Sequence, residues 1–229
     1  MTYEEYFISC YPNEGVGYFK DGEFFPLENI AEDKVHSFEV DPSFMLLEPT
    51  ALLHSHTVPV HHGLDPRTPS QTDLASQIAT DIEWGVCYTD GERCSEPLWW
   101  GNPNNRPPLE GRNFVSGVYD CLSLARDYYH SVGIDVPHHA YDVFWAQDGE
   151  DHIGSLWKDW GFEEVELADL QPGDALLYQV RSPVINHIGI YLGDNQVLSH
   201  WYGRLSCVES FGTWARYIQK AIRKCNPQQ

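Results

Sequence analysis

The chain has 229 residues, 42% hydrophobic and 14% aromatic, enough to bury the core of one large domain or two small ones. Its 34 acidic residues against 14 basic ones give a formal net charge of −20, which argues against a nucleic-acid-binding protein, because phosphate backbones need clustered Lys and Arg. No stretch approaches the roughly 18 apolar residues of a membrane span. The first ten residues lack the features of a secretory signal, so we expect folding in a cytoplasm and six reduced cysteines, none in a C-x-x-C pair.

The first half of the chain predicts short strands followed by a helix. Residues 15–27 alternate around a K-D-G turn and predict a β-hairpin. Residues 36–40 and 50–56 predict two more strands, the second buried and ending in two histidines. From Ser70, placed as an N-cap, apolar residues recur every four positions and predict a helix, and residues 84–88 predict another strand.

The strand and the helix of this half carry residues suited to a metal ion. Histidines two apart on a strand point to the same face, so His54 and His56 can reach one ion. Asp73, in the first helical turn, can add an oxygen ligand, which gives the pattern of a catalytic zinc site with one position left to water. Glu14 can take a proton from that water. An H-x-H pair alone is a weak signal, and it can arise by chance in a chain with 11 histidines.

Together, Glu14, the H-S-H run at 54–56 and S-x-x-D at 70–73 resemble the signature of the JAMM/MPN metalloproteases, and residues 26–41 resemble that domain's opening hairpin. The resemblance implies a mixed sheet with helices and one zinc ion. Glu14 would be the general base and Ser70 would support the oxyanion. The implied zinc ligands are His54, His56 and Asp73.

One feature departs from the JAMM/MPN pattern. Thirteen residues separate His56 from Ser70, whereas the usual family loop is shorter. The extra segment carries His61, His62 and Asp65. These residues are either a solvated loop or a group that competes for the ion or caps the site.

A segment rich in breakers separates the two halves. Residues 96–112 hold four prolines and two glycines, so we expect a first domain over 1–95, a linker over 96–110 and a second domain over 111–229. In the second domain the clearest helix begins at Cys121 and stops before Gly133. Its apolar face is expected to hold Leu124, Ala125, Tyr128 and Val132, and strands are expected at 174–180, 186–192 and 196–202. A helix followed by an antiparallel sheet is an α+β arrangement.

Cys121 is the first residue of that helix. A helix N-terminus stabilises a thiolate, and a nearby imidazolium lowers the thiol pKa further, so Cys121 can act as a nucleophile. The alternative is a core thiol on an amphipathic helix. His187 and His200 lie on later strands and can supply a base and a residue that orients it.

The Y-D-C run at 119–121, residues 170–178 and residues 186–200 resemble the NlpC-type cysteine peptidases, which have a papain-like fold, and the resemblance covers 111–215. It implies Cys121 as nucleophile and His187 as base, with Tyr119 and the amides around Cys121 near the oxyanion. It also implies cell-wall stem peptides as substrates, cut after a γ-linked D-glutamyl residue.

The residue that orients the base is open between two neighbours. The usual spacing of twelve residues after the base falls on Ser199, and His200 lies just beyond it. Adjacent strand residues face opposite ways, so only one of them can face His187 unless a bulge intervenes. We favour His200, because an imidazole fixes the tautomer of the base better than a hydroxyl.

The two halves in this order resemble the tail assembly proteins of lambda-like siphophages. The resemblance implies a protein that assembles in the host cytoplasm, contacts tail-tip proteins and opens host peptidoglycan, with a place in the virion tail tip. Its zinc site would process a tail protein or remain as a docking fold. A structural tail-assembly factor with vestigial sites is the alternative.

Overall fold

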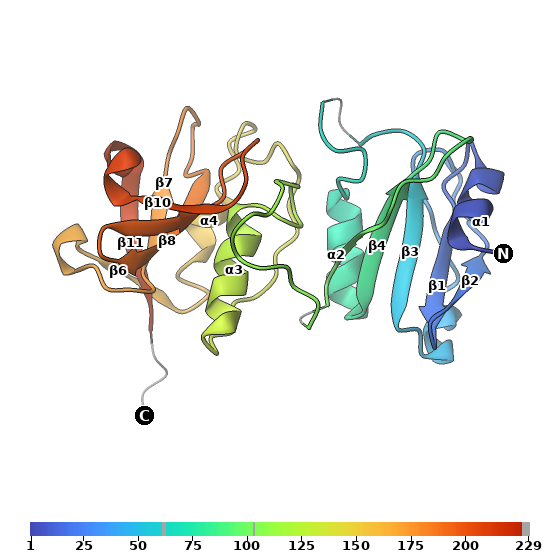
Figure 1. Ribbon diagram of the computed structural model, residues 1–229, viewed down its shortest axis with the longest axis horizontal. Helices are drawn as coiled ribbons and strands as arrows, with labels where there is room; N and C mark the ends of the chain where they lie inside the picture. Colours follow the sequence, from blue (N-terminus) through green and yellow to red (C-terminus); the bar gives the residue numbers. More distant parts are fainter. Residues whose placement is uncertain (61–62, 103, 226–229) are drawn as a thin grey trace. The chain divides into compact units, whose positions relative to one another are not determined.

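The computed structural model describes residues 1–60, 63–102 and 104–225 (Figure 1). The chain divides into two compact units, Met1–Asn105 and Arg106–Gln229. Each contains one sheet, and the fold is α+β in both. Part of the segment expected as a linker belongs to the first sheet, because Leu98–Trp100 form its last strand.

The first unit is built on a mixed sheet with the strand order β2-β1-β3-β4-β5. Strands β3 and β4 are parallel and are joined through helix α2, whereas the other neighbours are antiparallel. Parallel neighbours need such a crossover, which explains why a helix lies between these two strands in the sequence. The elements are β1 (Val16–Lys20), β2 (Glu23–Leu27), β3 (Ala51–His56), α2 (Gln71–Thr80), β4 (Glu83–Tyr88) and β5 (Leu98–Trp100).

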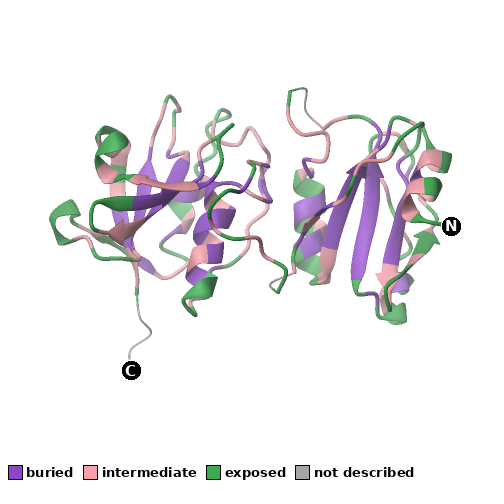
Figure 2. Cartoon of the chain, viewed as in Figure 1, coloured by how far each residue is buried: buried purple, intermediate pink, exposed green. Residues whose placement is uncertain are grey.

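Helices cover both faces of this sheet (Figure 1). On one face, Phe7 of α1 (Tyr3–Cys10) packs in a cluster with Leu53 and Cys87. On the other face, the indole Nε1 of Trp84 donates to Thr80 of α2 at 2.9 Å. Strand β3 lies between the two helices and is buried along its whole length (Figure 2).

The predicted hairpin, the strand 50–56, the helix from Ser70 and the strand 84–88 are confirmed. The hairpin turns through Asp21 and Gly22, whose φ angles of 53° and 81° are those of the turn that matches strand twist. The predicted strand 36–40 is wrong. Two of its backbone groups bond to the side-chain amide of Asn29 and not to a neighbouring strand: Asn29 Nδ2 donates to Ser37 O, and Asn29 Oδ1 accepts from Glu39 N. A 3-10 helix, Pro42–Leu47, follows that segment.

The second unit is built on an antiparallel sheet with the strand order β10-β9-β8-β7-β11-β6. The three predicted strands are β7, β8 and β9. The other three were missed because most of their residues are partly exposed, so they show no clear alternation. The strands are β6 (Phe162–Val165), β7 (Ala175–Tyr178), β8 (His187–Gly193), β9 (Gln196–Ser199), β10 (Cys207–Ser210) and β11 (Ile218–Lys224).

Helix α3 (Cys121–Ser131) packs on one face of this sheet, in a cluster that includes Ile188 and Ile190 of β8. Leu124 and Ala125 are buried as predicted, but Val132 is 54% exposed and Tyr129 is buried in its place. Tyr128 packs against the same cluster, as predicted, whereas Val132 lies beyond the last helical residue, Ser131. The remaining short elements are α4 (His152–Leu156) and 3-10 turns at Leu167–Asp169, Phe211–Thr213 and Ala215–Tyr217.

Candidate functional site

The first unit brings His54, His56 and Asp73 together, as predicted. The two histidines alternate with Ser55 on β3 and so share the sheet face that α2 covers. Asp73 reaches them from the first turn of α2, with its carboxylate oxygens 3.8 Å from His54 Nε2 and 3.7 Å from His56 Nε2. One ligand atom from each residue lies within 4.8 Å of the others, so this buried group can hold a metal ion.

Two observations support a cation at this position. Both ring nitrogens of His54 are buried without a hydrogen-bond partner among the described residues, which is costly unless something binds them. Burial lowers the pKa of His54 to about 4, so its imidazole is neutral and can act as a ligand. Burial alone would raise the pKa of Asp73, but His54 and His56 hold it well below the usual range, so it is a carboxylate. Burial opposes the shift, but the hydrogen bond and charge of Asp73 raise the pKa of His56, so zinc would have to displace a proton from that ring. Two imidazoles and one carboxylate are a ligand set that zinc accepts.

The long loop between His56 and Ser70 fixes the ring of His56. The ring Nδ1 of His56 donates to Pro66 O at 3.0 Å, which leaves Nε2 directed at Asp73. Such an outer hydrogen bond fixes the tautomer of a metal-binding histidine. Asp65 pairs with Arg67 at 2.8 Å and is not part of the group, while His61 and His62 lie outside the described residues.

Glu14 and Ser70, the other predicted residues of this unit, line one cavity together with His56 and Asp73. Burial raises the pKa of Glu14 to about 8. Ser70 is the N-cap of α2: its hydroxyl donates to Asp73 Oδ2 at 2.7 Å and accepts from Asp73 N at 3.1 Å. The hydroxyl thus orients Asp73, and its role at an oxyanion stays a prediction.

In the second unit, Cys121 begins α3 as predicted. The preceding residue, Asp120, is the N-cap and accepts from Ser123 N at 3.0 Å. Its other carboxylate oxygen accepts from Gly117 N at 2.7 Å and from the Tyr141 hydroxyl. Three hydrogen bonds to one carboxylate therefore hold the turn that carries the thiol.

The expected low pKa of Cys121 is wrong for this arrangement. Burial and, after it, the charge of Asp120 raise the pKa of the thiol to about 12. The backbone N–H groups of Ile188, Cys121 and Leu122 oppose this shift without overcoming it. The sulfur is therefore protonated at neutral pH, and the amide of Ile188 that faces it belongs to the residue after His187.

Stacking on an indole fixes the ring of His187. The imidazole lies 3.5 Å from the ring centre of Trp201 at an interplanar angle of 16°. The Nε1 of Trp201 donates to Glu209, which also accepts from Trp214 Nε1 at 3.1 Å. Burial, and then His200, lower the pKa of His187 to about 3, so its imidazole is neutral. A neutral imidazole can accept the proton of a thiol.

Strand alternation places Ser199, rather than His200, on the face of His187. A Cβ added to Gly189 would lie 3.0 Å from the Ser199 hydroxyl, so Ser199 shares a face with residues 187 and 189. Ser199 Oγ is buried without a described partner. His200 packs against Phe114, with ring centres 5.2 Å apart, and both its ring nitrogens lack a described partner. The expected facing of His200 and His187 is thus not found, and the identity of the orienting residue stays a prediction.

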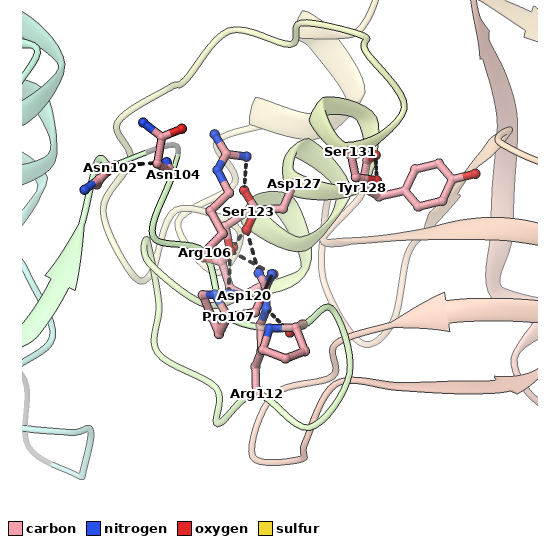
Figure 3. Close-up of polar contacts among 11 residues, drawn as sticks. Asn102, Asn104, Arg106, Pro107, Arg112, Asp120, Ser123, Asp127, Tyr128 and Ser131 are labelled. Atoms are coloured by element: carbon pink, nitrogen blue, oxygen red, sulfur yellow. Dashed lines mark hydrogen bonds and ion pairs between the residues drawn. The ribbon is translucent and has the colours of Figure 1, made fainter.

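A buried ion-pair network ties the segment before Cys121 to α3 (Figure 3). The Asp127 carboxylate pairs with Arg112 at 2.6 Å and with Arg106. The Arg112 guanidinium also donates to the carbonyls of Pro108 and Pro107 at 2.7 and 2.6 Å. Residues 106–112, expected to be largely linker, are therefore part of the architecture around the thiol.

Sequence reasoning missed Asp120, Trp201 and Asp127 as residues that support this site. The D-x-x-S spacing at 120–123 is a capping signal and could have indicated Asp120. Trp201 and Asp127 belong to no sequence motif, and their partners Glu209 and Arg112 lie 8 and 15 residues away.

A thiol at the start of a helix packed on an antiparallel sheet, with a histidine on the adjoining strand, places this unit among the candidate cysteine hydrolases. The model of the NlpC/P60 family matches residues 96–223, more than half of the chain, and the chain belongs to that family. No helix in the described part of the chain is long and apolar enough to cross a membrane.

The similar proteins include phage tail proteins. The chain is a homologue of the tail tip assembly protein K of Escherichia phage lambda, with 35% identity over 74% of this chain and 78% of that protein. It is also 30% identical to tail tip assembly protein K of Escherichia phage N15, over 87% of this chain and 82% of that one. Among solved structures, an NLP/P60-family protein from Staphylococcus aureus matches with a TM-score of 0.38 and 20% identity, over 52% of this chain and 38% of that one.

Proposed function

We propose that the second unit is a cysteine peptidase that cuts stem peptides of host peptidoglycan at the phage tail tip. The observation that carries the proposal is the position of Cys121 at the start of α3, facing the backbone N–H beside His187, in a chain of the NlpC/P60 family. The relatives named for tail tip assembly support the location and tail-protein partners.

The chemistry follows from two neutral groups. In the proposed step, the sulfur of Cys121 attacks a peptide carbonyl while its proton passes to His187, the first residue of β8. Formation of the carbon–sulfur bond has to drive this transfer, because the pKa of the thiol is about 12 and that of the imidazole about 3. The amides at the start of α3 can stabilise the oxyanion. The protonated imidazole then gives its proton to the departing amine. Water hydrolyses the thioester and restores the thiol.

Isolated sacculi test this proposal. We expect the wild-type chain to release new amino termini from peptidoglycan, and the Cys121→Ala variant to release none. Cys207→Ala is the matched control, because Cys207 is a half-buried thiol on β10 outside the α3 turn. If all three proteins are silent, the proposal fails and a structural tail-assembly factor with vestigial sites is favoured. If Cys121→Ala retains activity, Cys121 is not the nucleophile.

A second activity is proposed for the first unit, as a zinc-dependent hydrolase that processes a tail protein. The observation in its favour is the buried group His54, His56 and Asp73, with both nitrogens of His54 lacking a described partner. Zinc held there would supply a Lewis acid that polarises a peptide carbonyl. The charge of the zinc ion would lower the pKa of Glu14 from about 8 and favour its carboxylate form. Glu14 would then take a proton from the attacking water and pass it to the departing amine, leaving a carboxylate and a free amino group.

Elemental analysis tests the metal without relying on activity. We expect about one zinc per wild-type chain, as a single catalytic zinc site requires, and loss of that zinc in His54→Gln. His36→Gln is the control, because His36 is an exposed histidine paired with Asp33. A folded wild-type chain that takes up no zinc from a zinc-containing buffer would refute this second proposal.

A further inference from the structure

A large cavity opens beside the His-His-Asp group of the first unit. Its volume is about 660 Å³, within the range of about 300–1,000 Å³ typical of ligand sites. Glu14, His56, Ser70 and Asp73 form one part of its lining. A group bound in the cavity would therefore lie next to the proposed hydrolytic residues.

The rest of the cavity is mostly apolar. Two of its lining rings contact His54 of the metal-binding group: the ring centres of Phe38 and Trp84 lie 4.7 and 6.2 Å from that of His54. Leu52, Phe44 and Trp84 are core residues that also line the space. The apolar side chains that form this wall include Phe38, Phe44, Met45, Leu52, Val58 and Trp84.

The charge of the cavity excludes one class of occupant. Its lining holds the acidic residues Glu14, Glu39 and Asp73. Among the described residues that line it, none is a lysine or arginine. The lining histidines, His36 and His56, lie outside the apolar wall. A carboxylate bound against that wall, away from these rings and from the metal-binding group, would lose its hydration without gaining a cationic partner, which is unfavourable.

We propose that this cavity selects a polypeptide with a bulky aliphatic or aromatic side chain beside the bond to be cut, and rejects acidic residues there. The inference rests on the hydrolase proposed for the first unit and names its substrate class. It means that the first unit recognises an apolar segment of a protein chain rather than an acidic peptide.

Peptide binding tests the cavity separately from hydrolysis. The protein is the full chain with Cys121→Ala, which silences the second unit, and Glu14→Gln, which blocks turnover in the first. The probes are fluorescent hexapeptides that are identical except for Leu, Gly or Glu at one central position. We expect the Leu peptide to bind at least about tenfold more tightly than the Gly peptide, from burial of its side chain. The Glu peptide should bind no better than the Gly peptide.

Two variants of α2 provide a matched pair. Ser76 lines the cavity, so Ser76→Phe should fill it and weaken binding of the Leu peptide about tenfold or more. Ala75 is exposed on the same helix, so Ala75→Phe should leave binding unchanged. Equal binding of the Leu and Gly peptides, preference for Glu, or equal effects of the two variants would overturn the proposal.

Hydrolysis is then measured with Glu14 restored and zinc present. Selective binding of the Leu peptide without cleavage would refute the hydrolase and keep the cavity's apolar preference. Cleavage with no preference for Leu would keep the hydrolase and refute the cavity's role.

Discussion

The ion-pair network at α3 gives the sharpest test of the second unit. Asp127 is 7% exposed and pairs with Arg112, whose side chain is 2% exposed, and with Arg106. In the Asp127→Asn variant the new amide still accepts one hydrogen bond, but the buried guanidinium of Arg112 loses its counter-charge. Removing one partner from a buried pair typically costs about 3–5 kcal/mol. We therefore expect Asp127→Asn to lower the free energy of local unfolding of α3, the opening free energy, by about 3–5 kcal/mol.

Glu164→Gln is the matched control for this substitution. It also removes one carboxylate from an ion pair of the second unit, with Lys220 at 2.7 Å, but the two side chains are 52% and 34% exposed. Exposed pairs contribute about 0–1 kcal/mol. Amide hydrogen exchange of the α3 peptides, measured by mass spectrometry, reports on this unit alone. If both variants change the opening free energy by less than about 1 kcal/mol, burial does not decide the strength of this network.

Three further predictions concern the thiol site and its sheet. The pKa of His187 is about 3 in the folded chain and 6.5 ordinarily, so the unfolded chain binds more protons below pH 6.5 and the free energy of unfolding falls as the pH drops. Between pH 7 and pH 5 this loss is about 2 kcal/mol, and urea titrations of His187→Gln should not show it. Because burial raises the pKa of Cys121 to about 12, iodoacetamide should modify Cys121 more slowly than the exposed Cys225 at pH 7. The modification rate of Cys121, measured by peptide mapping, should rise about tenfold per pH unit up to pH 9, and a plateau near pH 7 would contradict this. Gly189→Ala would place a Cβ 2.9 Å from Val197 Cγ1 and should destabilise the sheet by about 1–3 kcal/mol in thermal unfolding, whereas Gly212→Ala, whose Cβ meets nothing closer than 4.0 Å, should match the wild type.

The sequence was most informative where local patterns decide the structure. The hairpin at Asp21 and Gly22, the capped helix after Ser70 and the helix from Cys121 all carry short-range signals, and all are present. The same applies to His54 and His56, because alternation on one strand is enough to place both rings on one face.

Long-range contacts decided what the sequence could not predict. In the segment 36–40, which is not a strand, the side chain of Asn29 bonds two backbone groups, at sequence separations of 8 and 10 residues. The pKa of Cys121 depends on the depth of burial, which helix position does not reveal. The choice between Ser199 and His200 depends on the register of β8 and β9, which a count of residues from the base leaves open.

Cys121 is 9% exposed and holds its proton firmly. Thiolates, not thiols, are attacked by peroxide and exchange with disulfides, so a protonated and shielded sulfur ages slowly in oxidising surroundings. The burial that makes this sulfur a poor nucleophile at rest would thus also protect it from oxidation for as long as the second unit stays folded.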